Sequence, residues 1–490
     1  MCRALLRPVR QDKKDSSMRM FRLGWPAWAR PADIGDLLRL SVPIAFTRMS
    51  QMLMGVTDAI VLGQFAPGEL PYILNSWLPM GVSLGLGIGI LLGVQVLTSE
   101  LLGIGREGES GRIFRRGFVT SVVLGIVLMA VVYFSAGALF HWLFVDIAPK
   151  TDAVDQADPA LVASSVAHVT RILSFGLVGF MISTVCSYYL EALRRPLLVT
   201  AVMYFGVFLN LGIDLALVGG FWGFEPMGAE GVAWATTGSR WALTLVMLVL
   251  VLILTPALTQ SAHKGAPNEA RKQLSVGSGT AISNIAEWGG FNLTYIIATW
   301  ISLAANTVYG YAIQLMGLCF MFYLGIASAT SVRVAEAYGR GNVAEIRDAG
   351  RLGVAATVLM GLILGALVVL FNDTLAGLLV RDTAVMNGVQ LAPAIASLLA
   401  YAAVATMFDG LQATSSFALR AQDVIWSPSV IHIGSFFLVM IPACYWLGIV
   451  REGGATGMML GVMLGVFTAG SLQTILLEWK TARQASQRAV

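Results

Sequence analysis

Charged residues are scarce in this 490-residue chain, and their scarcity excludes most classes of soluble protein. Only 12% of the residues are charged, whereas 57% are hydrophobic and the mean hydropathy is +0.75. This balance is typical of an integral membrane protein and excludes a soluble enzyme domain. The net charge of +4 is small and unevenly distributed, so we expect no nucleic-acid partner.

Metal-ligand and disulfide patterns are missing as well. The four cysteines and the four histidines are scattered along the chain, and no CxxC or Cys/His ligand spacing occurs. We therefore expect the cysteines to pack as small hydrophobic side chains, and we expect neither a structural metal site nor a cofactor.

The first 37 residues lack the apolar core of a cleavable signal peptide. This stretch is basic and polar, which predicts a cytoplasmic tail. Two alternatives stay open, a disordered tail and a tail whose Trp25 and Trp28 lie at the membrane surface. Met18 and Met20 are alternative start sites.

Long apolar runs are abundant, and each is long enough to cross about 30 Å of hydrocarbon. They predict an all-α integral membrane protein with about twelve transmembrane helices. The predicted segments are 38–63, 73–100, 116–144, 164–192, 197–220, 229–256, 276–302, 306–337, 351–372, 389–418, 425–448 and 455–478. The polar linker 257–275 separates two six-helix lobes, 38–256 and 276–480, and a second tail covers 481–490.

Positive charge indicates how these segments are oriented. Lysine and arginine cluster in or beside the even-numbered connections and at the C-terminal end, whereas the odd-numbered connections carry more acids. By the positive-inside rule both termini are cytoplasmic. We expect a multi-pass protein of the inner (plasma) membrane.

The two lobes also resemble each other in sequence. Residues 99–117 match residues 335–353 at an offset of 236, with Glu100 on Glu336 and three glycines in register. A second match pairs 192–194 with 418–420 at an offset of 226. Six segments per lobe give both copies the same orientation, which predicts a parallel repeat about an axis along the membrane normal. A cavity is then expected between the lobes at the midplane.

The segment 276–302 carries a carboxylate near its middle, Glu287. An unpaired carboxylate at that depth costs roughly 2.5–3.5 kcal/mol. Helical spacing places Ser283 and Asn284 on the same face as Glu287 and places Ile285 on the opposite face. We therefore expect Glu287 to point into the bundle or into a wet cavity.

Three further acids lie within predicted segments, and they complete a set of candidate site residues. Asp409 has small polar helical neighbours, and Asn210 lies one turn before Asp214 on the same helix face. A low-dielectric cavity favours the protonated form of a carboxyl group, so such groups bind and release protons, and their oxygens also ligate hard cations. The alternative is a structural hydrogen bond or an ion pair with an arginine. The candidates for the coupling ion or the substrate are Glu287, Asp409, Asp58, Asn210 and Asp214, with Asn284, Gln314 and Gln412 as further polar residues of the cavity; Glu287 and Asp409 are the candidate Na⁺ ligands.

Three arginines lie within apolar runs, and they bear on how freely the acids can titrate. Arg48 and Arg171 are near enough to segment ends to extend their guanidinium groups to the membrane surface. Arg240 is deeper, and an ion pair with Asp214 or Asp58 would stop that acid from titrating freely.

Several runs occur in an order and spacing that resemble one known family. They are VTDAIVLG around Asp58, GIGREGE (103–109), LNLGID (209–214), PMGAEGVAWAT (226–236), NTVYGYAIQ (306–314) and GIASATSVRVAEAYGRGN (325–342), together with Glu287 and Asp409. Over about residues 38–480 the chain resembles the multidrug and toxic compound extrusion (MATE) transporters, NorM-like members in particular. The resemblance implies a V-shaped, two-lobed antiporter that exports cationic or amphipathic drugs and is driven by inward flow of protons or sodium ions.

The sequence departs from this family pattern at two positions. Arg240 has no counterpart in the pattern, and Ala405 replaces a tyrosine that NorM-like proteins tend to carry one turn before the acid equated with Asp409. Because Ala405 supplies no oxygen, the departure favours H⁺ over Na⁺ as the coupling ion.

Three functions are candidates on these grounds. A drug antiporter fits the acids, the repeat and the resemblance. A flippase for a lipid-linked or polyanionic substrate needs a basic cavity, for which only Arg48, Arg171 and Arg240 are available. A membrane-embedded enzyme needs a catalytic cluster or an extramembrane domain, and the short loops provide neither. We therefore predict an antiporter that acts as a monomer in membrane lipid, with small-molecule cations and H⁺ or Na⁺ as its partners.

Overall fold

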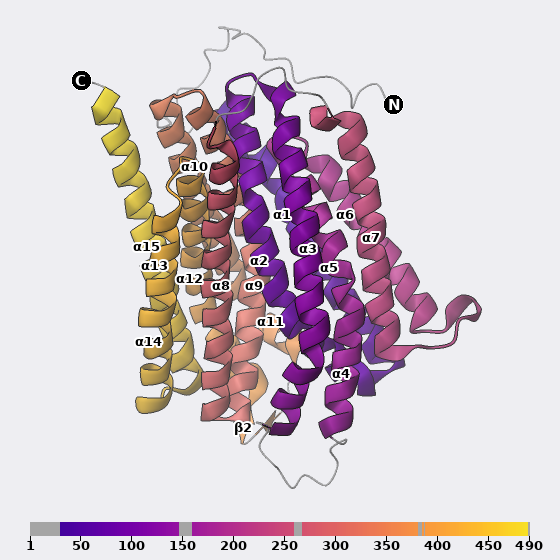
Figure 1. Ribbon diagram of the computed structural model, residues 1–490. Helices are drawn as coiled ribbons and strands as arrows, with labels where there is room; N and C mark the ends of the chain where they lie inside the picture. Colours follow the sequence, from indigo (N-terminus) through magenta and orange to yellow (C-terminus); the bar gives the residue numbers. More distant parts are fainter. Residues whose placement is uncertain (1–29, 147–158, 259–266, 381–384, 387, 489–490) are drawn as a thin grey trace.

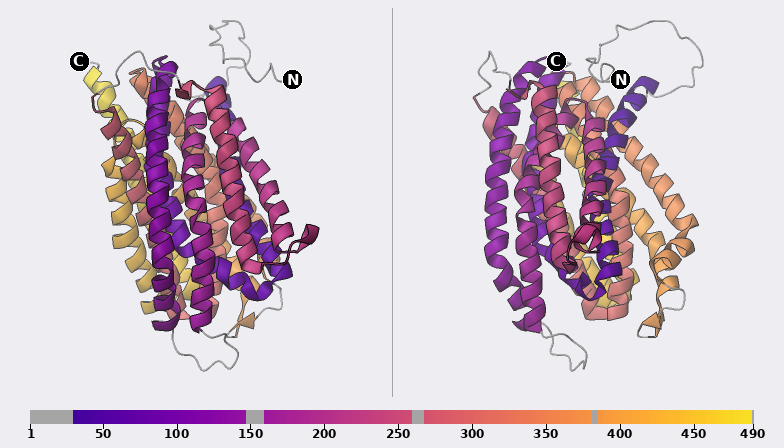
Figure 2. Two further views of the ribbon diagram at one scale, coloured as in Figure 1. Left: turned by 45° about the vertical axis from the view of Figure 1, so that its right-hand side comes forward. Right: turned by 90° about the vertical axis from the view of Figure 1, so that its right-hand side faces the viewer.

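The structure is a computed structural model that describes residues 30–146, 159–258, 267–380, 385–386 and 388–488. Its helices form one bundle of long, roughly parallel rods (Figure 1). Helix α1 begins and helix α15 ends at the same end of the bundle, which we call the terminal end (Figures 1 and 2). Most of the predicted tail 1–37, the middle of the linker 257–275 and the last two residues of the tail 481–490 lie outside the described residues.

We call residues 30–258 the N-half. Its described α-helices are α1 (Pro31–Phe65), α2 (Leu70–Gly103), α3 (Ser110–His141), α4 (Pro159–Ser174), α5 (Gly176–Ala192), α6 (Pro196–Leu217) and α7 (Gly228–Leu254). Short 3₁₀ turns lie at Pro67–Glu69, Glu107–Glu109, Phe221–Gly223 and Pro256–Leu258, and a π-turn at Trp142–Asp146 extends α3. Pro31 opens α1 because its fixed φ suits the first helical turn, so the helix begins inside the segment predicted as a tail.

We call residues 267–488 the C-half. Its described α-helices are α8 (Glu269–Ile301), α9 (Leu303–Gly339), α10 (Val343–Leu370), α11 (Asn372–Leu379), α12 (Leu391–Arg420), α13 (Trp426–Ile433), α14 (Ile441–Tyr445) and α15 (Gly454–Arg488). The π-helical segments Gly434–Met440 and Trp446–Val450 join α13 and α14 into one continuous rod. A two-residue antiparallel hairpin pairs β1 (Val385–Met386) with β2 (Val389–Gln390).

The predicted all-α membrane fold is confirmed, because each of the twelve apolar segments falls on a helix or a run of helices. The segment 164–192 is divided between α4 and α5 at Phe175, and the segment 425–448 runs through α13, α14 and their π-turns. By length and composition, ten helical segments in the described part of the chain can cross a membrane. Helices α1 and α8 are long enough but less apolar, as expected of segments that carry buried polar residues.

The two halves contact each other where α1 packs against α9 and α2 packs against α8. These helices approach closely because each crossing has a glycine. A Cβ at Gly89 of α2 would collide with the backbone of Ala281 in α8, and a Cβ at Gly325 of α9 would collide with Ala45 in α1. Gly325 follows Gly89 by 236 residues, and Ala281 follows Ala45 by the same number. The predicted offset therefore relates the two halves in three dimensions as well.

The second predicted match, at an offset of 226, is wrong by three residues. Helix α5 ends with the amide of Arg195 donating to the carbonyl of Leu190 (2.8 Å), and Arg194 between them has a left-handed φ of 58°. Helix α12 ends in the same way, with Val424 donating to Leu419 (3.0 Å). Equal geometry thus pairs residues 229 apart. The loop sequences suggest that Arg194 corresponds to Arg420. The hydrogen bonds that end the two helices show instead that Arg420 occupies the position in the C-half that Glu191 occupies in the N-half.

Two cavities lie beyond the crossings, on the side away from the terminal end. One, of about 250 Å³, lies between the halves and is lined by α1, α6, α9 and α11. The other, of about 100 Å³, lies within the N-half and is lined by α1, α2, α5, α6 and α7. We call them the central cleft and the N-half cavity. The first α1 residue that lines the central cleft is Met49, and the first that lines the N-half cavity is its neighbour Ser50.

Candidate functional site

Three of the predicted site residues meet in the N-half. Asp58 of α1 and Asn210 and Asp214 of α6 are all buried, and the Asp214 carboxyl and Asn210 amide groups lie next to the Asp58 carboxyl group. Thr236 of α7 donates a hydrogen bond to Asp58 Oδ2 at 2.8 Å. Two adjacent buried carboxyl groups repel each other strongly if both are ionised, so this pair is most stable with one shared proton.

Arg240 of α7 lies in the wall of the N-half cavity together with Asp58. Its charge attracts Asp58, yet the described residues form no ion pair with Arg240. The guanidinium instead lies over two aromatic rings, 5.4 Å from the centroid of Trp77 and 5.6 Å from that of Phe180. Such cation–π contacts stabilise the charge but leave hydrogen-bond donors unused. Arg240 therefore lies near Asp58 but forms no ion pair with it among the described residues.

The predicted C-half residues also come together. Glu287 of α8 and Asp409 of α12 are buried, and Asp409 lies close enough for its charge to affect the Glu287 carboxyl group. Gln412 of α12 lies beside both acids, donating from Nε2 to Asp409 Oδ1 at 3.0 Å and lying close enough to interact with the Glu287 carboxyl group. The cluster therefore offers four carboxyl oxygens and one amide oxygen to a proton or a small hard cation.

Two neighbours of Asp409 bear on the choice of ion. Ala405 is completely buried, and its methyl group occupies the position at which the family pattern has a tyrosine, so this position offers no oxygen ligand. Tyr323 of α9 approaches from another helix, and its hydroxyl group lies close enough to interact with Asp409. In the described part of the chain no three His, Cys, Asp or Glu side chains form a metal-binding group.

Arg420 was expected at a loop, but it is the last residue of α12 and only 1% exposed. It donates hydrogen bonds to Ser283 Oγ (2.5 Å) and to the carbonyl of Gly279 (3.3 Å), and it also bonds to Ser416. It thereby joins α12 to α8, the helix of Glu287. Its charge reaches Glu287 from the terminal-end side of the cluster.

The remaining predicted polar residues lie elsewhere. Asn284 donates to the carbonyl of Gly85 (2.9 Å) and so ties α8 to α2 at the contact between the halves. Gln314 lines the central cleft. Arg171 is half-buried; its Nε donates to the backbone carbonyl of Tyr133 (3.4 Å), and its guanidinium lies 5.9 Å from the centroid of the Tyr133 ring.

Comparisons with known proteins agree on one family. The family model described as MatE matches residues 43–216 and 280–446. A probable multidrug resistance protein NorM from Caulobacter vibrioides is 32% identical over 467 residues, which cover 93% of this chain and 94% of that protein. The chain belongs to the MATE family of transporters. It is therefore a transporter and not an enzyme.

More distant relatives fit this assignment. Multidrug resistance protein MdtK of Yersinia pseudotuberculosis is 24% identical over 455 residues, 91% of this chain and 95% of that protein. A crystal structure of MATE in the straight conformation has a TM-score of 0.81 at 16% identity, with 93% and 97% of the two chains covered. A eukaryotic MATE transporter has a TM-score of 0.79 at 17% identity, with 94% and 99% covered. The solved structures confirm the MATE fold.

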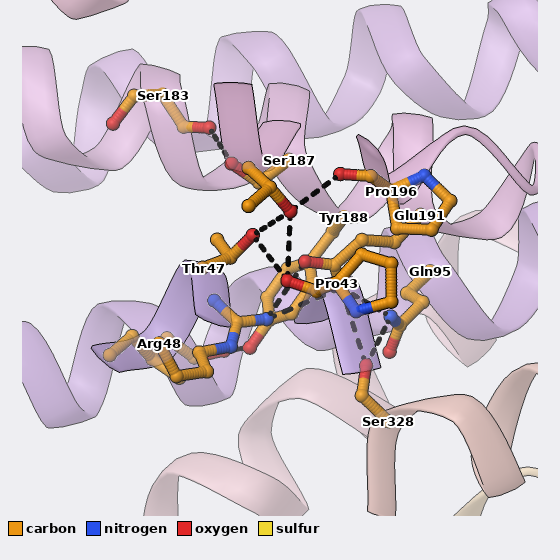
Figure 3. Close-up of polar contacts among 12 residues, drawn as sticks. Pro43, Thr47, Arg48, Gln95, Ser183, Ser187, Tyr188, Glu191, Pro196 and Ser328 are labelled. Atoms are coloured by element: carbon orange, nitrogen blue, oxygen red, sulfur yellow. Dashed lines mark hydrogen bonds and ion pairs between the residues drawn. The ribbon is translucent and has the colours of Figure 1, made fainter. Parts of the chain in front are cut away.

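Sequence reasoning missed one buried acid of this MATE transporter, Glu191 at the end of α5. Arg48 Nη2 lies 3.2 Å from both of its carboxylate oxygens, and Gln95 Nε2 donates to Oε2 at 2.8 Å (Figure 3). Gln95 and Glu191 also bond to Ser328 of α9, at 2.7 and 3.3 Å, so the network crosses between the halves. Arg48 is thus held in a buried ion pair and does not extend to the surface. Arg48, within an apolar run, was the signal that a buried acid must exist.

Ion pairs between the halves close the terminal end of the MATE bundle. Arg194 of the N-half contacts Glu336 of α9 through two 2.7 Å hydrogen bonds. Lys272 of α8 contacts Glu100 of α2 at 2.8 Å. Glu100 and Glu336 are the two glutamates matched by the 236-residue offset, so each half supplies an acid to a base of the other.

Proposed function

We propose that this MATE transporter is a secondary active antiporter that exports organic cations and amphipathic drugs in exchange for protons. The C-half cluster carries the proposal. Glu287 and Asp409 are buried together with Gln412 beside both, and the described residues give neither acid an ion pair with a base. Intramembrane acids of this kind commonly carry the coupling ion. The printed names of its relatives, multidrug resistance proteins, support the substrate class.

Energetics require an exchanged ion. Carrying a monovalent cation outward against about 100 mV costs roughly 2.3 kcal/mol per charge. A proton that binds the C-half cluster removes negative charge and so lowers the affinity for a cationic drug. Drug release and proton entry are then linked. H⁺ fits better than Na⁺ because Ala405 withholds an oxygen ligand.

The orientation of the bundle follows from its basic residues. Arg194, Lys272 and Arg333 lie at the terminal end, so the positive-inside rule makes that end cytoplasmic. The ion pairs between the halves then close the cytoplasmic side, and the central cleft belongs to an outward-facing state. A reporter inserted after Gly341 should stay inside the cell, and one inserted after Gly223 should be exported. The reverse pattern would overturn this orientation.

The central cleft suits amphipathic drugs. Its walls are mostly apolar and include Met49, Met52, Tyr204, Tyr311 and Gln314 from both halves. Thioether side chains adapt to ligands of different shape, and aromatic rings attract cations.

The coupling assignment can be tested with Glu287→Gln and Asp409→Asn in the full chain, reconstituted in energised vesicles. Each variant should lose drug-evoked proton release, in the presence and in the absence of Na⁺, because it loses a titratable carboxyl group. Glu230→Gln is the matched control, since Glu230 is an exposed acid on α7. If both variants keep wild-type exchange while Asp58→Asn loses it, the coupling site is in the N-half. Exchange that requires Na⁺ would identify sodium as the ion.

A flippase for polyanionic lipids was the alternative, and it has less support. Arg48 is paired with Glu191, and Arg171 donates to the backbone carbonyl of Tyr133, so of these three arginines only Arg240 lines a cavity in the described part of the chain. One arginine does not make a polyanion site. Export of anionic lipid conjugates, with no organic cation moved, would reverse this preference.

A further inference from the structure

His432 of α13 is buried without a hydrogen-bond partner in the described part of the chain. It is 3% exposed, and both Nδ1 and Nε2 of its ring are unpaired among those residues. The ring lies near that of Phe436, with 5.8 Å between the centroids. Buried polar groups are normally paired, so a histidine with two unpaired ring nitrogens requires an explanation.

Two contacts set the alignment of α8 with the rod that contains α13. Ser283 Oγ donates to Ser429 Oγ at 3.2 Å. Further along, a Cβ at Gly290 would lie 3.1 Å from the Cβ of Phe436. The second contact follows the first by seven residues on each helix, so the two helices run in the same direction and stay in contact over this length.

Glu287 and His432 lie between these two contacts. Glu287 is four residues after the first contact residue of α8, and His432 is three residues after that of α13. Residues three and four apart share one helix face, so each side chain is on the face that its helix turns toward the other. The acid assigned to the coupling ion and the unpaired histidine therefore face each other at one level of the bundle.

Charged groups around His432 come from α8 and α12. Arg420 of α12 donates to both serines of the first contact, at 2.5 and 3.4 Å, and its charge reaches His432. This charge repels a second positive charge and so favours a neutral imidazole ring. The acids of the cluster are Glu287 from α8 and Asp409 from α12. Helix α15 contributes a neutral residue, Gln473, which donates to a backbone carbonyl of α13 at 3.4 Å.

Unpaired oxygens continue beyond His432. Ser435 lies three residues further along the rod, away from the terminal end, and is buried with no partner for its Oγ among the described residues. Gln473 Oε1 is buried and likewise unpaired within the described ranges. The π-helical segment Gly434–Met440 begins two residues after His432, and such segments are frequent at functional sites. Polar groups thus extend from the C-half cluster past the histidine.

We propose that His432 relays the coupling proton to and from Glu287. A neutral imidazole ring holds a proton on one nitrogen and accepts a proton at the other. A proton that binds the free nitrogen forms one N–H bond, and the other N–H bond breaks as its proton passes to the Glu287 carboxylate. The ring is neutral before and after, in the opposite tautomer, and the reverse transfer restores the first. The inference rests on the proposed proton coupling and adds a route for the proton.

The test is His432→Gln in the full chain, because glutamine keeps hydrogen-bonding atoms but does not relay a proton. Ethidium binding to the purified protein is measured by fluorescence over a range of pH, and ethidium-evoked proton release by stopped flow with a pH dye. The variant should bind ethidium with wild-type affinity and pH dependence and release as many protons, because Glu287 and Asp409 remain. The rate of release should fall about a hundredfold, the lower end of what a positioned acid–base group contributes.

The matched control is His168→Gln, which makes the same change at an exposed histidine beside Glu230. It should alter neither the rate nor the binding. A purely structural role for His432 would weaken ethidium binding or reduce the number of protons released. Either of those results, or a wild-type rate in His432→Gln, overturns the relay.

A second measurement leaves His432 in place. Replacing His141, His168 and His263 by glutamine leaves His432 as the one histidine of the chain, so ring-labelled histidine then reports on it alone. Infrared difference spectra recorded on ethidium addition should show a change of tautomer, and Glu287→Gln should abolish that change. If His432→Gln does not fold, these spectra decide, and spectra without a tautomer change overturn the relay.

The outcomes also distinguish the relay from the proposed function. If the wild type and His432→Gln release protons at the same rate, the relay fails and the antiporter stands. If the wild type exports ethidium without releasing protons, proton coupling fails and the relay fails with it. If ethidium evokes proton release that His432→Gln slows, but vesicles export no organic cation, the export function fails and the relay stands.

Discussion

The two halves of this transporter use buried charge in opposite ways, although they share one repeat. At equivalent positions near the ends of α5 and α12 the N-half has Glu191 and the C-half has Arg420. Glu191 forms an ion pair with Arg48, whereas Arg420 donates to neutral serine and carbonyl oxygens. Further along each half lies a pair of acids, of which only the N-half pair shares a cavity with an arginine.

This difference teaches that a structural repeat conserves helix crossings more strictly than chemistry. The glycine contacts Gly89–Ala281 and Gly325–Ala45 are related by one offset because both set the distance between backbones. Side chains between the crossings are not bound by that constraint. The C-half can therefore place Glu287 and Asp409, the acids to which we assign the coupling ion, side by side, while the N-half places Asp58 and Arg240 in the wall of one cavity.

Breaking the Glu191–Arg48 pair should have the largest effect. Glu191→Gln leaves the Arg48 charge buried without a counter-ion, which should lower the free energy of unfolding by about 3–5 kcal/mol. Arg420→Gln, at the equivalent position, removes hydrogen bonds to neutral groups and should cost less, about 1–3 kcal/mol. Unfolding of the purified protein in detergent, followed by intrinsic fluorescence, measures both.

A double variant provides the control for this comparison. Arg48→Gln combined with Glu191→Gln removes both charges and should recover part of the lost stability, because no buried charge stays unpaired. If the double variant is less stable than Glu191→Gln by the full cost of a second independent change, the ion pair is not the source of the effect.

Substitutions at the two helix crossings, α2 with α8 and α1 with α9, should lower the stability by similar amounts, unlike substitutions of the buried charges. Gly89→Val and Gly325→Val each force a side chain into the backbone of the facing helix, so both should cost about 1–3 kcal/mol, and by similar amounts. Gly63→Val is the control, since a Cβ at Gly63 has open space around it. Thermal unfolding measures the three variants. A large difference between the two crossings would show that the repeat is not equivalent at its contacts.

The sequence allowed the fold and the pairing of acids within each half to be predicted, for identifiable reasons. Apolar runs of membrane-spanning length leave no other structure that satisfies the backbone hydrogen bonds. Glu287, Asp409 and Gln412 could be grouped because each had a small polar helix face, and the structure brings them together. Family resemblance agreed with this expectation.

Other features depended on contacts between distant helices, which spacing along one helix does not reveal. Glu191 lies at the end of the predicted segment 164–192, and nothing along that segment indicated that its partners Arg48 and Ser328 would come from α1 and α9. Arg420 follows the predicted segment 389–418, so it was expected at a loop. The position of Arg240 over Trp77 and Phe180 likewise needed three helices to be placed at once.

The ion pairs that close the terminal end should give the smallest effect, and they differ between the halves in one respect. Arg194 holds Glu336 by two hydrogen bonds, and the Glu336 side chain is 5% exposed, whereas Lys272 holds Glu100 as a point charge at 18% exposure. Glu336→Gln should therefore lower the free energy of unfolding by about 1.5 kcal/mol, and Glu100→Gln by less than about 1 kcal/mol. Raising the salt concentration to about 1 M should shrink the second effect more than the first, because the more exposed pair is more strongly screened. Unfolding at low and high salt measures both differences. Equal losses with equal salt dependence would mean that the two closures are equivalent, and that the asymmetry of the halves is confined to the buried charges.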